Sequence, residues 1–93
     1  MIGFDAKVTE LTVGALVTAG VSPSEADTIA AANHQTCVDE INGFRVANQG
    51  LADRASGLDE SQFPAPPNPI YDLYAWKAAF IDFAAWVTAN LVP

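Results

Sequence analysis

A helix-start signal at residues 22–25 constrains the fold of this chain more than any other local feature. Ser22 is suited to the N-cap position, Pro23 to the first helical position and Glu25 to the third, which together make a capping box. Apolar and small residues then keep alternating spacings of four and three for more than three heptads. This seam consists of Ala30, His34, Cys37, Ile41, Phe44, Asn48, Leu51 and Ala55. The seam keeps its phase through Asn42-Gly43, so we predict one long helix over residues 23–55. A break at that turn-forming pair stays an open alternative.

Two further helices and a linker complete the predicted architecture. Residues 5–19 carry helical stripes of apolar residues, with Asp5 as N-cap and Gly20 as the C′ residue. A strand remains the alternative there, because Val, Thr and Gly14 weaken a helix. Prolines at 64, 66, 67 and 69 make residues 56–69 a linker, and residues 70–91 form an aromatic helix after it. The sequence thus predicts an all-α, three-helix fold, with residues 1–93 as a single domain.

Charge excludes two classes of partner. The net charge is −7, and the four basic residues Lys7, Arg45, Arg54 and Lys77 are scattered singly. Binding to phosphates or to an anionic membrane surface requires clustered Lys and Arg. We therefore expect no direct nucleic-acid binding and no membrane binding. The acidic surface favours solubility or a basic protein partner.

Cysteine use and hydropathy indicate the compartment. Cys37 is the only cysteine, so no disulfide forms within the chain and a reducing compartment is expected. No signal peptide is recognised, and the apolar stretch 78–92 is too short to span a bilayer. These features predict a cytoplasmic protein. Few lysines with much Ala, Thr and Asn are typical of small phage accessory and virion proteins, for which a virion location is the alternative, but no motif identifies a family.

Candidate chemistry receives little support from the sequence. His34 and Cys37 lie within one helical turn, but two ligands do not complete a zinc site, and nothing marks an oxyanion hole for a cysteine nucleophile. The acidic groups Asp39-Glu40, Asp59-Glu60 and Asp72 fit solvated carboxylates better than a shielded acid–base pair. No glycine-rich phosphate loop follows a plausible strand. We expect no enzyme activity, no metal and no cofactor.

The residues that suggest association lie on the two longer predicted helices. Apolar residues cover about half the circumference of the last helix, which is more than one core-facing stripe requires. Within that arc, Lys77 either extends its stem to the edge or meets an acidic partner. His34 and Asn48, the polar residues of the seam, either fix the register of an assembly or face solvent. The candidate interface residues are Tyr71, Trp76, Lys77, Phe83, Trp86, His34 and Asn48.

Two functions follow from these patterns. The first is a non-enzymatic structural or assembly subunit, either a homo-oligomer or part of a larger assembly, whose apolar contacts resist salt. The alternative is a small acidic inhibitor, or a decoy that mimics nucleic acid and binds a basic host protein. Such binding would weaken steeply as salt rises.

Overall fold

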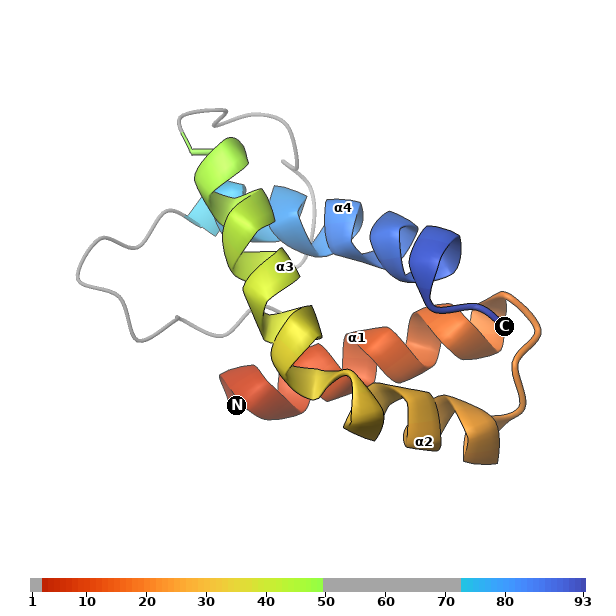
Figure 1. The fold of residues 1–93 in the computed structure, drawn as a ribbon. Coiled ribbons are helices and arrows are strands. Elements are labelled where there is room, and N and C mark those ends of the chain that lie inside the picture. The colour runs from red at the N-terminus through yellow and green to blue at the C-terminus, as the bar shows by residue number, and fades with distance from the viewer. Residues whose placement is uncertain (1–2, 50–72) are drawn as a thin grey trace.

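The described part of the chain contains four α-helices, rather than the three predicted, and no strand. In the computed structural model, residues 3–49 and 73–93 are described. Their elements are α1 (Phe4–Thr18), α2 (Pro23–Ala32), α3 (His34–Ala47) and α4 (Leu73–Asn90). Figure 1 shows α1 and α2 running side by side in opposite directions, while α3 leads away from them to α4. None of these helices is long and apolar enough to cross a membrane. The predicted linker 56–69 lies outside the described residues.

The turn between α1 and α2 follows from local chemistry. Gly20 has φ +101°, a conformation that favours glycine. Its N–H donates to the carbonyl of Val17 at 3.0 Å, and the N–H of Val21 donates to that of Leu16 at 3.0 Å. These two bonds form a Schellman motif, which closes α1 and confirms Gly20 as the predicted C′ residue.

The start of α2 also follows the prediction. Ser22 is the N-cap, and its Oγ accepts a hydrogen bond from the backbone N–H of Glu25 at 3.3 Å. Pro23 occupies the first helical position, where its missing N–H costs no hydrogen bond. Because these contacts join residues within one turn, the sequence alone is sufficient to predict them.

The predicted long helix 23–55 is wrong, because the chain bends at Asn33. This residue ends α2 and precedes α3, with φ −112° and ψ 15°. Both its side-chain Nδ2, at 2.9 Å, and its backbone N–H, at 3.1 Å, donate to the carbonyl of Ile29 in the last turn of α2. At Asn42-Gly43, by contrast, α3 continues unbroken. The bend directs α3 toward α4, against which it packs (Figure 1).

The predicted end of that helix at Ala55 is also corrected. Helix α3 ends at Ala47, and Asn48 is its C-cap. The Nδ2 atom of Asn48 donates to the carbonyl of Phe44 at 2.9 Å and to Asp82 Oδ2 on α4 at 2.8 Å. The helix therefore ends where an asparagine side chain caps its last turn and connects it to α4.

The core lies where α1, α3 and α4 meet. Helix α4 contributes most to it, because the six consecutive residues Ala75–Phe80 are buried, and Phe83 and Val87 follow at helical spacing. The largest fully buried side chains are Trp76, Phe83, Leu16, Ile41, Val8, Val87, Thr12 and Cys37. Helix α2 adds only Ala26 and Ala30 as buried residues. The apolar excess predicted for the last helix is therefore used largely within the chain.

Candidate functional site

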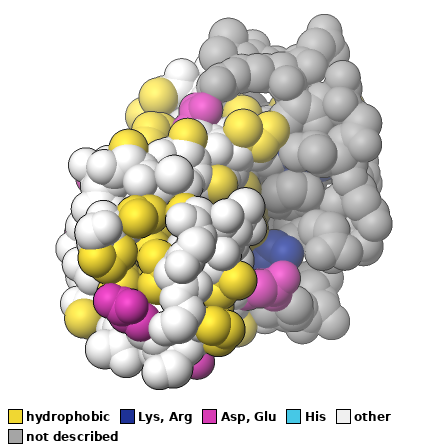
Figure 2. Space-filling view, turned by 90° about the vertical axis from the view of Figure 1, so that its right-hand side faces the viewer, with side chains coloured by type: hydrophobic (Ala, Val, Ile, Leu, Met, Phe, Trp, Pro, Cys, Tyr) yellow, Lys and Arg dark blue, Asp and Glu magenta, His cyan; other side chains and the backbone are white. Residues whose placement is uncertain are grey.

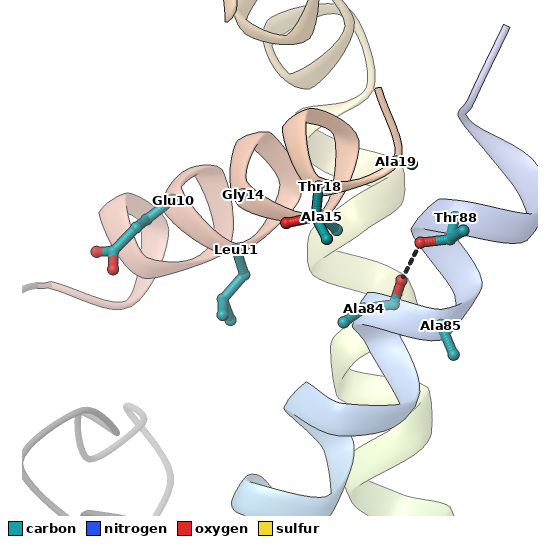
Figure 3. Close-up of a pocket in the computed structure, with 9 residues that line it drawn as sticks. All are labelled: Glu10, Leu11, Gly14, Ala15, Thr18, Ala19, Ala84, Ala85 and Thr88. Atoms are coloured by element: carbon teal, nitrogen blue, oxygen red, sulfur yellow. Dashed lines mark hydrogen bonds between the residues drawn. The ribbon is translucent and has the colours of Figure 1, made fainter. Parts of the chain in front are cut away.

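An open groove between α1 and α4 is the candidate site. Its volume is about 700 Å³. One wall comes from the second half of α1 and the residue that follows it, and the other wall comes from the second half of α4 (Figure 3). The lining residues are Glu10, Leu11, Gly14, Ala15, Thr18, Ala19, Ala84, Ala85 and Thr88. Six of the nine are Gly, Ala or Leu, so the groove is predominantly apolar and its walls carry little side-chain bulk.

Helical spacing places these residues together. On α1, residues 11, 14, 15 and 18 share one face, and on α4 residues 84, 85 and 88 do the same. The larger apolar residues of α4, Phe83 and Val87, point into the core and are fully buried. Small residues therefore remain on the side of α4 that faces the groove, and the two helices do not close over it.

Gly14 is the least expected residue of the groove. It lies in the interior of α1, where glycine is less stable than alanine by about 0.5–1 kcal/mol. A Cβ atom at this position would meet nothing within 4 Å, and its φ is not in the left-handed region. No contact or conformation within the described part of the chain requires a glycine here. Its effect is to leave the α1 wall of the groove without a side chain at this point.

The groove offers few fixed polar groups. The hydroxyl of Thr88 donates to the carbonyl of Ala84 at 3.1 Å and is thus used within α4 (Figure 3). Glu10 is the only titratable residue of the lining, and its Oε1 lies 3.4 Å from Nζ of Lys7. A single carboxylate that is already paired does not supply the two groups of opposed pKa that acid–base catalysis requires. The lining residues therefore do not include an acid–base pair of this kind.

The predicted aromatic anchors on α4 lie mostly inside the molecule. Trp76 is 1% exposed and meets the ring of Phe4 edge-on, with 5.2 Å between ring centroids. Phe83 is fully buried and stacks on Trp86, which is half-buried, at 5.8 Å. Of these three, only Trp86 reaches the surface. Tyr71 lies outside the described residues.

Lys77 does not reach solvent, as a snorkelling stem would. The residue is 2% exposed, and its Nζ lies 5.5 Å from the centroid of the Tyr74 ring on the same helix. An ammonium over an aromatic face gains cation–π stabilisation that partly offsets its desolvation. A second cation, Arg45 on α3, has its guanidinium carbon Cζ 5.5 Å from the centroid of the Trp76 ring on α4. Both cations are therefore engaged within the chain.

The two polar residues of the predicted seam have different surroundings. Asn48 is 2% exposed and is bonded to Asp82 of the same chain, so its polar group is satisfied without a second subunit. His34 begins α3 with its side chain 36% exposed, and its Nε2 lies 3.8 Å from Asp5 Oδ1 on α1. The structure thus places His34 and Asn48 at opposite ends of α3, apart from the groove.

Cys37 has the surroundings of a packing residue. It is fully buried, and burial is the main cause that raises the pKa of its thiol. The nearby Glu40 carboxylate raises this pKa further, whereas a hydrogen bond with Thr12 lowers it. A raised pKa disfavours the thiolate, which is the nucleophile and metal ligand. Within residues 3–49 and 73–93, no group of three or more His, Cys, Asp or Glu side chains is placed to hold a metal.

Sequence reasoning did not find the groove. The available signal was Gly14 within a helix, followed by Ala15 and Thr18 at helical spacing, together with the small residues Ala84 and Ala85. We instead interpreted Gly14 as a weakness of the helix.

No family model, curated protein or solved structure matches the chain. Its function is therefore argued from this geometry.

Proposed function

We propose that this chain is a non-enzymatic protein-interaction subunit, which binds another protein through the α1–α4 groove as part of a larger assembly. The observation that carries the proposal is the groove itself, which is open, has a volume of about 700 Å³, is predominantly apolar and has Gly14 in its α1 wall. A partner that covers this apolar lining removes it from water, which favours binding.

A binding partner other than a second copy is favoured by charge. Two copies of a chain with net charge −7 repel each other, and their repulsion opposes a groove-to-groove contact. Self-association is accordingly an outcome of the test below and not the form that we propose.

The test compares the native chain with two glycine variants. Gly14→Leu places a side chain in the groove, whereas Gly43→Leu adds the same side chain to α3, where a Cβ also meets nothing within 4 Å. The three proteins are immobilised, and the proteins that they retain from the source cell are quantified by mass spectrometry. We expect a partner that is retained by the native chain and by Gly43→Leu but lost with Gly14→Leu.

Retention of the same proteins by all three variants would contradict a groove-based interaction. Light scattering after size exclusion, at low and at high salt, tests self-association in parallel. A mass of twice 9.8 kDa that returns to 9.8 kDa in Gly14→Leu would assign the groove to a second copy.

The distribution of charge supports a second candidate, an acidic inhibitor or decoy for a basic protein. In the described part of the chain, Asp5, Glu10, Glu25, Asp27 and Asp39 are exposed. Lys7 and Lys77, by contrast, are buried. A decoy binds through its carboxylates, so its binding weakens with salt and is insensitive to Gly14→Leu. The same variants therefore distinguish the two functions.

A further inference from the structure

We infer that the occupant of the α1–α4 groove is a basic amphipathic helix of a different protein, with small apolar residues on the face that enters the groove. This inference rests on the proposed interaction function and specifies the chemistry of the partner.

The helical form follows from the few polar groups of the groove. An extended peptide leaves backbone N–H and C=O groups that must find partners, and burying them unpaired is costly. The lining offers only Glu10, Thr18 and Thr88 as polar side chains, and Thr88 donates to the carbonyl of Ala84. A helix pairs its own backbone N–H and C=O groups, so it can lie in a groove that offers few polar partners.

Small residues on the partner face follow from the shape of the groove. Gly14, Ala15, Ala84 and Ala85 keep both walls low, so the backbone of an incoming helix can approach closely. Helices pack at 8–10 Å between axes, and the shorter separations require small side chains at the contact. The absence of a Cβ at Gly14, which nothing in the described chain requires, fits such a close approach.

The basic character follows from the charges around the groove. No Lys or Arg is among the lining residues, which include the carboxylate of Glu10, and the chain has a net charge of −7. On the side of the molecule shown in Figure 2, acidic side chains lie beside exposed hydrophobic ones. The Lys or Arg atoms visible in this view lie beside an acidic side chain. Glu10, in the groove itself, has a side chain that is 50% exposed despite its contact with Lys7. Lys or Arg on the flanks of the partner helix would complement these carboxylates.

The probe for the test is a displayed library of helix-forming peptides of about five turns, roughly 18 residues. Its positions are randomised among small apolar, large apolar, acidic and basic residues, and it is selected on the native chain. We expect enrichment of peptides with an apolar stripe rich in Ala or Gly and with Lys or Arg on its flanks. Binding of the enriched peptides should fall by about tenfold or more in Gly14→Leu and stay unchanged in Gly43→Leu.

Other outcomes would overturn the inference in identifiable ways. Enrichment of neutral or acidic peptides would contradict the basic character. Equal binding to Gly14→Leu and to the native chain would place the site elsewhere, while the protein-interaction function would still stand. A groove-dependent dimer of the chain would make the second copy the occupant. Absence of any enriched peptide, combined with a monomeric mass and no groove-dependent capture, would reject the inference and the proposed function together. Circular dichroism of each variant checks that the helical fold is kept.

Discussion

Gly14 and Gly43 lie within helices, whereas Gly20 follows the end of α1 with a positive φ, so the alanine variants of these three glycines form a matched series. Gly14 and Gly43 lie within α1 and α3, and a Cβ at either would meet nothing within 4 Å. Alanine in a helix interior is more stable than glycine by about 0.5–1 kcal/mol. Since no clash opposes this gain, we expect Gly14→Ala and Gly43→Ala each to raise the free energy of unfolding by about 0.5–1 kcal/mol.

Gly20 should respond in the opposite direction. Its φ of +101° lies in a region that side chains rarely adopt, although a Cβ there also meets nothing within 4 Å. We expect Gly20→Ala to lower the free energy of unfolding by about 1–2 kcal/mol, the cost of left-handed backbone for an L-residue. The contrast isolates backbone conformation from packing, because space around the Cβ is equal at all three positions.

Urea unfolding followed by far-UV circular dichroism measures all four proteins, with an unchanged m-value as the control for two-state behaviour. For a domain of this size, 1 kcal/mol corresponds to about 4–8 °C in Tm, so the expected gains are about 2–8 °C. Destabilisation by Gly14→Ala would refute the reasoning, because it would mean that the native fold needs a bare backbone at this point. In that case Gly14 would serve the packing of the chain and not the groove.

Three further changes test other parts of the structure. Ser22→Ala removes the side-chain acceptor of α2 and should cost about 1 kcal/mol, read from the urea midpoint, whereas Ser22→Gly should cost only a few tenths. Asn48→Leu removes a buried hydrogen bond to a carboxylate and should cost about 1.5–3 kcal/mol; a double-mutant cycle with Asp82→Ala that gives no coupling would argue against this bond. Cys37 should react with a thiol reagent only as fast as the chain opens, and rapid labelling of the folded protein would contradict its burial. Folding raises the pKa of the Cys37 thiol above its ordinary value of 9.0. The stability that the buried, protonated thiol contributes is therefore present below pH 9.0 and is lost as the pH rises through the pKa of the folded state. A Cys37→Ala variant should lack this alkaline loss.

The bend at Asn33 shows why the number of helices was not predictable. Ala30 on one side, and Cys37 and Ile41 on the other, are all buried, so the apolar spacing continues across the break. One residue with non-helical torsions changes the direction of the chain while it hardly changes the phase of the pattern. No Gly or Pro marks the site. The residue at the break is Asn33, whose side chain donates to the carbonyl of Ile29, and only the structure shows this local bond.

Burial of the candidate interface residues was undetermined for a related reason. Periodicity identifies which residues of α4 share a face, but the width of the buried arc depends on how many helices surround it. Helices α1 and α3 both pack on α4, and Trp76, Lys77 and Phe83 are all buried. The role of these residues in binding a partner stays a prediction. The groove that carries the proposed function is lined by other residues, which the apolar pattern did not single out.

The sequence by itself determined the helical class, the capping of α2 by Ser22 and the end of α1 at Gly20. Each of these depends on hydrogen bonds and torsions within about one turn of chain, which the local residue types specify. Only the tertiary structure decided the bend at Asn33, the end of α3 at the Asn48–Asp82 bond, and the groove between α1 and α4. The Asn48–Asp82 bond and the groove join residues from tens of positions apart, so their energies exist only once the helices have packed against one another. The bend has a local hydrogen bond at Asn33, but the apolar spacing continues across it, so the sequence pattern predicts one helix.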